Sequence, residues 1–125
     1  MSEVLFTKNA PAAVGPYSQA IKEGNILYCS GQIPLVPETG ELVQGDIKAQ
    51  AAQALKNVKA VLTEAGAKET NVVKTTVYLT DMADFGGVNE VYADFFGDHK
   101  PARSCVAVKE LPKGAKVEIE VLVVL

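Results

Sequence analysis

Apolar residues alternate with polar ones in three short runs at the start of the chain, which is the period of β-strands. The first two runs, residues 4–7 and 20–21, are separated by a segment that contains Pro and Gly. The third run, residues 25–34, breaks at Gly31 and again at Pro34. We expect three strands here, the last of which is interrupted.

The spacing becomes helical after Asp46, a residue that favours the N-cap of a helix. The next twenty or so residues are rich in Ala, Gln, Lys and Leu, which favour helices. The apolar stripe of this segment consists of Ile47, Ala51, Ala54, Leu55, Val58, Val61, Leu62 and Ala65. Gly66 fits the position just beyond a helix end, so the sequence predicts one long helix between Asp46 and Gly66.

A strand and a second helix follow. Residues 72–80 are β-branched and alternating, which predicts a strand. Either Asp81 or Asp84 caps the helix after it, and Gly97 ends that helix before Pro101. The apolar stripe of the second helix consists of Phe85, Val88, Tyr92, Phe95 and Phe96.

The end of the chain reads as two alternating strands, residues 101–106 and 116–121, joined by a short loop around residues 111–114. This pattern predicts a C-terminal hairpin. On the second strand Glu118 and Glu120 share one face, while its Val and Ile residues take the other.

Together these elements predict a single domain, residues 1–125, of the α+β class. A mixed sheet with both helices packed on one face buries both apolar stripes at once and gives a two-layer sandwich. The other face would carry Glu118, Glu120, Leu122 and Val124. Burial of that face against another subunit is one interpretation. Scattered apolar residues on a free surface are the alternative.

Composition excludes several classes of function. Of the 125 residues, 48% are hydrophobic and 22% are charged, with a net charge of −3. Nucleic-acid binding depends on Lys and Arg that neutralise phosphates, so this acidic balance speaks against a nucleic-acid partner. The chain has no polybasic patch for a membrane surface, no basic and apolar leader at its start, and no apolar run of the roughly 20 residues needed to span a bilayer.

The Cys and His content excludes the common metal sites. Cys29 and Cys105 lie far apart in the sequence, and His99 is the single histidine. Neither a disulfide framework nor a zinc-binding spacing is present. We expect a cytoplasmic protein without a metal ion.

Candidate chemistry lies near the C-terminus. Arg103 and Cys105 are two residues apart on one strand and project from the same face. An Arg, a thiol and a carboxylate among apolar residues can recognise a small carboxylate substrate and activate water. Arg103 could equally be a surface residue or part of a structural ion pair. Cys105 has no evident His partner, so we expect it to contribute backbone groups and packing rather than a nucleophile.

Six segments of the chain resemble the Rid (RidA, or YjgF-type) family of reactive-intermediate deaminases. They are APAAVGPYSQA (residues 10–20), SGQIP (30–34), TTVYLTDM (75–82), VNEVYADFF (88–96), PARSC (101–105) and VEIE (117–120). The segments span almost the whole chain in the order of the family, and PARSC with the downstream Glu-Ile is the most specific of them.

The resemblance implies a chorismate-mutase-like α+β fold that assembles as a homotrimer with clefts between subunits. It implies hydrolysis of enamine and imine intermediates, such as 2-iminobutanoate and 2-iminopropanoate, to 2-oxo acids and ammonia, without a cofactor. Carried over by motif, the site comprises Tyr17, Ser30, Gly31, Asn89, Arg103, Cys105 and Glu118.

In this interpretation Arg103 binds the substrate carboxylate and Glu118 deprotonates the attacking water. Glu120 is a rival on the same strand face, and only the motif match selects Glu118. A non-catalytic protein that binds 2-oxo acids and regulates metabolism is the alternative function. Ribonuclease or translation-inhibitor activity has been attributed to relatives, but the acidic balance and the lack of stacking aromatic residues argue against it.

Overall fold

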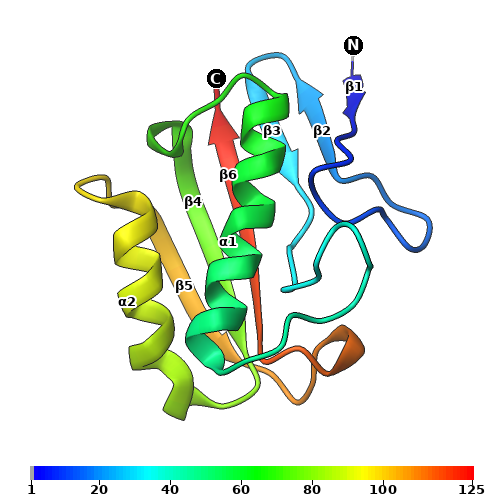
Figure 1. The fold of residues 1–125 in the computed structure, drawn as a ribbon. Coiled ribbons are helices and arrows are strands. Elements are labelled where there is room, and N and C mark those ends of the chain that lie inside the picture. Colours follow the sequence, from blue (N-terminus) through cyan, green and yellow to red (C-terminus); the bar gives the residue numbers. More distant parts are fainter. Residues whose placement is uncertain (1) are drawn as a thin grey trace.

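The computed structural model describes residues 2–125, and six strands within that range form one mixed sheet (Figure 1). The strands are β1 (Ser2–Leu5), β2 (Ala20–Glu23), β3 (Ile26–Cys29), β4 (Val72–Leu79), β5 (Ala102–Ala107) and β6 (Val117–Val124). Their order across the sheet is β1-β2-β3-β6-β4-β5, and β4 and β5 form the parallel pair. A strand is therefore found in each predicted N-terminal run, although β1 begins and ends two residues before the predicted run 4–7 and β3 ends before the break at Gly31.

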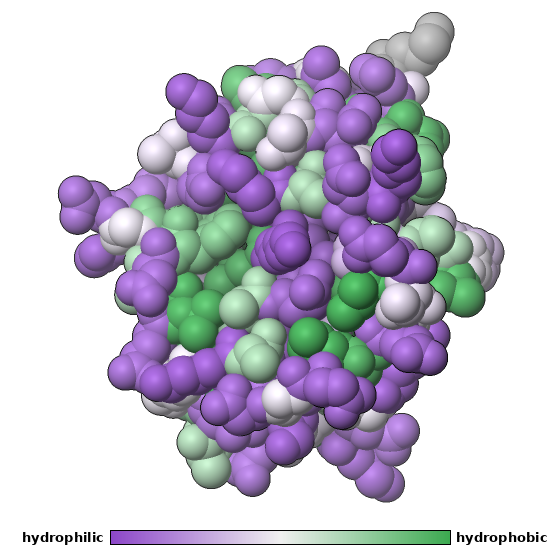
Figure 2. All heavy atoms as spheres, in the orientation of Figure 1, coloured by the Kyte–Doolittle hydropathy of each residue, from purple (hydrophilic) through white to green (hydrophobic). Residues whose placement is uncertain are grey.

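Two helices, α1 (Ile47–Glu64) and α2 (Phe85–Phe96), cover the same face of this sheet (Figure 1). Short 3-10 turns η1 (Glu69–Asn71), η2 (Met82–Asp84) and η3 (Pro112–Gly114) lie in the connections. The predicted α+β fold with a mixed sheet and both helices on one face is confirmed. Viewed from the helix side, the surface is mainly hydrophilic, with apolar residues visible between the two helices (Figure 2).

Strand β6 shows why the sheet has two different faces. Its odd-numbered residues from Val117 to Val123 are buried beneath the helices, whereas Glu118, Glu120 and Leu122 are half-buried on the other face. The core is formed by those odd-numbered residues and by the stripes of α1 and α2. Because successive side chains of a strand point to opposite faces, this alternation fixes the side on which each acidic residue lies.

Both predicted ends of the long helix are confirmed. The carboxylate of Asp46 accepts a hydrogen bond of 3.0 Å from the backbone N–H of Ala49, as an N-cap residue does. Gly66 has a φ of +73° just after the helix, the left-handed conformation that glycine adopts without strain.

The start of α2 is more complex than predicted. Asp81 caps the preceding turn η2 by accepting a 2.9 Å hydrogen bond from the N–H of Ala83. Asp84 occupies the N-cap position of α2 itself but makes no side-chain cap hydrogen bond. Gly97 ends the helix as predicted, with a φ of +61°.

The predicted C-terminal hairpin is wrong. Strands β5 and β6 do not pair with each other, because β4 lies between them and pairs with both. The connection over residues 108–116 contains η3 and is longer than the tight loops that close hairpins, so it can pass across the end of β4. The parallel pair of β4 and β5 is joined through α2, which is the crossover that parallel strands require.

Candidate functional site

The site residues predicted from the sequence lie mainly in two separate hollows of the folded chain. Tyr17, Ser30, Gly31 and Glu118 line one pocket with a volume of about 590 Å³. Asn89 and Arg103 line a separate hollow beside α2, with a volume of about 470 Å³. One chain therefore does not bring all of these residues together.

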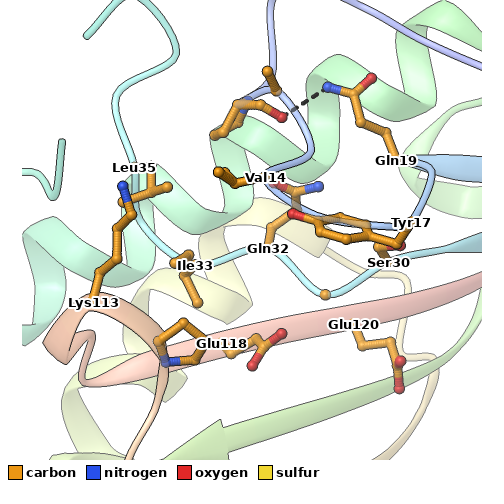
Figure 3. Close-up of a pocket in the computed structure, with 14 residues that line it drawn as sticks. Val14, Tyr17, Gln19, Ser30, Gln32, Ile33, Leu35, Lys113, Glu118 and Glu120 are labelled. Carbon is orange, nitrogen blue, oxygen red and sulfur yellow. Dashed lines mark hydrogen bonds between the residues drawn. The ribbon is translucent and has the colours of Figure 1, made fainter. Parts of the chain in front are cut away.

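The larger pocket lies over the β6 acids and beneath the N-terminal loop (Figure 3). Glu118 and Glu120 both project from β6 below the segment that carries Ser30 and Gln32 (Figure 3). The remaining lining comes from Pro11, Ala12, Val14, Gln19, Ile33, Leu35, Pro112 and Lys113. The pocket thus joins two carboxylates at its floor to a largely apolar wall.

Glu118 is half-buried in this pocket, and its environment favours the protonated form. Burial raises the pKa of Glu118 above the ordinary glutamate value, and the negative charge of Glu120 raises it further. Glu120, together with burial, also raises the pKa of Tyr78, which pairs with Glu118 across β4 and β6. A carboxylate with a raised pKa can take a proton from water and return it, as general acid–base catalysis requires.

Gly31 lies directly against the Glu118 side chain. A Cβ atom at this position would be 2.9 Å from Cδ and 3.0 Å from Cγ of Glu118, closer than side-chain contacts normally come. The next residue, Gln32, pairs with Ile119 through two backbone hydrogen bonds of 2.8 and 3.0 Å. The break in the predicted third strand therefore lets the backbone approach the carboxylate closely, which only glycine permits.

Ser30 anchors the N-terminal loop above the pocket, and Tyr17 is part of that loop. The Ser30 hydroxyl donates a 2.6 Å hydrogen bond to the carbonyl of Ser18, and its backbone N–H donates one of 3.0 Å to Gln19. Tyr17 lines the pocket and is 53% exposed, so its phenol is accessible to a ligand. Ser30 is thus partly a structural residue in this chain.

Arg103 lies on the edge strand β5 and packs against α2. Its guanidinium donates a 2.7 Å hydrogen bond to the side-chain oxygen of Asn89, and it lies over the rings of Tyr92, at 4.9 Å, and Phe85, at 5.4 Å. Tyr92 is itself fixed by a 2.8 Å hydrogen bond between its hydroxyl and that of Thr75. These contacts orient an exposed guanidinium while leaving part of its hydrogen-bonding fork for a ligand.

Cys105 follows Arg103 on the same side of β5. Burial raises the pKa of the Cys105 thiol, and the nearby Arg103 charge opposes this only in part. A thiol with a raised pKa is poorly suited to act as a nucleophile at neutral pH. The environment therefore agrees with a packing role and not with covalent catalysis.

The sheet register shows why the two groups of residues lie apart. Arg103 and Cys105 pair with Thr75 and Val77, which are buried on the helix side. Glu118 pairs with Tyr78, which points to the opposite face. Within one chain, Arg103 and Cys105 therefore lie apart from Glu118, because the intervening β4 separates β5 from β6.

Several pocket residues were not singled out from the sequence. Gln19 and Gln32 lie inside the family motifs of residues 10–20 and 30–34, and this position was the sequence signal that could have identified them as pocket residues. Lys113 carried no such signal. It has a φ of +59°, which is rare for a residue other than glycine. Its ammonium donates a 3.2 Å hydrogen bond to the carbonyl of Gly40. Such a local conformation is fixed by the fold rather than by the residue type.

Residues 2–125 contain no cluster of three or more His, Cys, Asp or Glu side chains that could hold a metal ion. Among these same residues, no helix has the length and apolar character needed to cross a membrane.

Comparison with known proteins gives consistent matches over the whole chain. A family model described as Endoribonuclease L-PSP matches residues 7–125. A RutC family protein of Pyrococcus horikoshii is 57% identical over 122 residues, which cover 98% of this chain and 97% of the relative. A 2-iminobutanoate/2-iminopropanoate deaminase of Escherichia coli is 52% identical over 127 residues, with coverage of 99% and 98%. The crystal structure of E. coli TdcF with bound serine superimposes with a TM-score of 0.94 at 44% identity and covers 98% of both chains.

Proposed function

The chain belongs to the Rid (YjgF-type, Endoribonuclease L-PSP) family, and on that premise we propose that it hydrolyses reactive 2-imino acids and their enamine tautomers to 2-oxo acids and ammonia. The observation that carries the proposal is the half-buried Glu118, whose raised pKa suits proton transfer, at the floor of a pocket of sufficient size. The names of relatives at about half identity support the same reaction.

In the proposed reaction Glu118 takes a proton from water as the water oxygen bonds to the imine carbon. The electron pair of the C=N bond moves to nitrogen, which takes the proton from Glu118, and a tetrahedral carbinolamine forms. Glu118 then takes the hydroxyl proton and passes it to nitrogen, so the C=O bond forms as the C–N bond breaks and ammonia leaves. Because the imine carbon is already electrophilic, no covalent enzyme intermediate and no cofactor are needed.

Arg103 supplies the recognition of the substrate carboxylate in this proposal. Its planar fork can donate two parallel, charge-assisted hydrogen bonds to the two oxygens. Asn89 fixes the orientation of the guanidinium, and backbone groups near Ser30, Gly31 and Cys105 together with the Tyr17 phenol complete the ligand shell. The serine in the TdcF crystal structure is itself a small carboxylate, which fits a site of this kind.

We further propose that the site forms between copies of the chain in a homotrimer. Arg103 and Glu118 lie on opposite sides of one sheet, so a complete site requires Arg103 from a second copy. A contact between two different surfaces of the same chain is heterologous, and such contacts form a closed ring where the rotation between copies is a whole fraction of a turn. The sheet face away from the helices, where Tyr28 and Val124 are exposed, would be covered in such a ring.

The decisive test couples the purified protein to a threonine dehydratase and follows the decay of 2-iminobutanoate. We expect imine decay to accelerate in proportion to added protein, and unchanged decay with active dehydratase would reject the proposal. Mass measurement in solution by light scattering tests the trimer separately, since a monomer at micromolar concentration would contradict it.

The alternative of a regulatory protein that binds 2-oxo acids makes a different prediction for Glu118→Gln. An enzyme should keep 2-oxobutanoate binding but lose turnover by about 10²–10⁴-fold. A regulatory protein would have no turnover to lose. The endoribonuclease description of the family predicts RNA cleavage, which a net charge of −3 disfavours. If the parent cleaves RNA and Glu118→Gln does not, the ribonuclease function would be favoured instead.

A further inference from the structure

A buried amide on α1 lies behind the apolar wall of the Glu118 pocket. Asn57 is completely buried, at 0% exposure, in a helix whose other core positions are mainly Ala, Val and Leu. A buried amide is costly unless it is hydrogen-bonded, and an apolar residue of similar size would pack against the sheet without that requirement. Its presence at this position therefore needs a specific reason.

The hydrogen bonds of Asn57 are directed at the pocket wall. Its side-chain N–H groups donate to the backbone carbonyls of Ile33, at 3.1 Å, and Leu35, at 2.9 Å. Its side-chain oxygen accepts a 3.0 Å hydrogen bond from Gln53 on the same helix. Both donors and the acceptor are thus satisfied, and both donors hold the segment that carries two pocket-lining side chains.

That segment belongs to no named strand: Leu35 bridges Leu42 through backbone hydrogen bonds of the flanking residues, and Asn57 holds the carbonyls of Ile33 and Leu35. Residues 33–35 lie beyond the end of β3, and Pro34 between the two bonded carbonyls has no N–H to offer. The backbone just before it, at Gly31 and Gln32, is fixed against Glu118 and Ile119. Asn57 thus supplies two of the hydrogen bonds that hold the wall, beside the backbone bonds that Val43 and Glu41 make with residues 34 and 36.

We propose that Asn57 is a positioning residue that determines substrate side-chain selectivity by holding Ile33 and Leu35 at a fixed distance from Glu118. This inference rests on the proposed function and adds a substrate class to it. The wall that Ile33 and Leu35 form is apolar, so an apolar substrate side chain can pack against it. On this basis the chain should accept 2-imino acids with branched side chains such as isobutyl.

The test compares the binding of two 2-oxo acids, 2-oxobutanoate and 4-methyl-2-oxopentanoate, by titration calorimetry. In the parent we expect the branched acid to bind more tightly. In Asn57→Leu, which keeps the number and branching of the side-chain heavy atoms but loses both donors, the affinity for the branched acid should fall about tenfold, the discrimination that one or two apolar contacts provide. The affinity for 2-oxobutanoate should change less than about twofold, because the ethyl group barely reaches the wall.

A matched control separates this effect from loss of stability. Val61→Ala removes a core side chain of the same helix, 2% exposed, which makes no hydrogen bond to the pocket wall. If Val61→Ala changes the ratio of the two affinities as much as Asn57→Leu does, or if Asn57→Leu weakens both acids equally, the inference is wrong. Should Asn57→Leu fail to fold, Asn57→Ser keeps one hydroxyl donor, and Ile33→Ala alters the wall itself; both must lower the affinity ratio in the same direction.

The outcomes also distinguish this inference from the proposed function. Imine hydrolysis by the parent with an unchanged affinity ratio in Asn57→Leu would overturn the inference alone. If the affinity ratio of the two acids depends on Asn57 but the protein does not hydrolyse imines, the positioning role of Asn57 is supported and the proposed deaminase activity is rejected. A parent that binds neither acid would overturn the inference.

Discussion

The two halves of the candidate site are built in different ways. Glu118 lies on β6, which has a strand on each side, and is held half-buried against Gly31. Arg103 lies on β5 at the edge of the sheet, exposed to solvent and oriented only by side chains of α2. The first half is fixed by the backbone of several strands, whereas the second depends on one hydrogen bond and two aromatic rings.

This difference matches the chemistry asked of each half. A carboxylate is a stronger general base where burial raises its pKa toward neutral pH, so partial burial suits Glu118. A guanidinium stays charged in any environment and can remain on a surface until a partner covers it. We infer that one chain provides the proton-transfer half alone, while recognition of the substrate requires a second copy.

Mixing two inactive variants gives the largest expected effect. Arg103→Ala should weaken substrate binding by about 10- to 100-fold, since it removes charge-assisted hydrogen bonds. Glu118→Gln should lower turnover by more than that. If each site takes Glu118 from one copy and Arg103 from another, co-expression of the two variants restores about a quarter of the parental activity, because random assembly leaves that share of sites intact.

The control for this experiment is the double variant Arg103→Ala/Glu118→Gln co-expressed with each single variant. Neither combination contains an intact pair, so neither should recover activity. A mixture of the single variants that stays as inactive as these controls would show that both side chains act within one chain. That result would contradict the site between copies that we infer from the pairing of β4 with β5 and β6.

Gly31→Ala tests the close fit in the acidic half. The added methyl group would overlap the Glu118 side chain and force its carboxylate to turn away. Since small misplacements of a catalytic group are costly, we expect turnover to fall about 10- to 100-fold. Steady-state kinetics with 2-iminobutanoate measure this loss, and the melting temperature shows whether the fold persists.

Gly86→Ala is the matched control for the glycine substitution. Gly86 lies in α2 with nothing within 4 Å of a Cβ atom at that position. Alanine should stabilise the helix by up to about 1 kcal/mol and leave turnover unchanged. Equal losses of turnover in the two variants would mean that Gly31 has no special relation to Glu118.

Comparison of sequence and structure shows the same division between the two halves. Periodicity predicted both helices, the alternation on β6 and the strand break at Gly31, because these are local properties of the chain. The insertion of β4 between β5 and β6 is a long-range pairing, and no local signal distinguishes it from a hairpin. The candidate site residues could thus be proposed from motifs, but the placement of Arg103 and Glu118 on two sides of the sheet could not be predicted.

The hydrogen bonds of Asn57 were hidden for a related reason. In the sequence this residue stands in the predicted long helix beside its apolar stripe and has no visible partner, because Ile33 and Leu35 are more than twenty positions away. Only the packing of α1 on the sheet brings their carbonyls to the amide. Buried polar residues of this kind become interpretable only when the fold is known.

Cys105→Ser gives a smaller expected effect. Burial raises the pKa of the thiol, so a thiolate is scarce at neutral pH and its nucleophilicity is not available for catalysis. We expect turnover to change less than about fivefold, because the backbone of β5 is retained. Loss of turnover as large as that in Glu118→Gln would instead assign covalent catalysis to Cys105.

The smallest expected effect is a change in the pH dependence of stability. Because the pKa of Glu118 is raised in the folded state by burial and by Glu120, the folded chain binds more protons than the unfolded chain between the ordinary glutamate pKa and this raised value. The free energy of unfolding of the parent therefore falls as pH rises through that window. Glu118→Gln cannot titrate, so its melting temperature should exceed that of the parent at neutral pH and approach it again below the ordinary glutamate pKa. Glu120→Gln, which removes the neighbouring charge and leaves Glu118, should show the same trend more weakly. If the melting temperatures of the parent and of Glu118→Gln depend on pH in parallel, Glu118 titrates normally in the folded state.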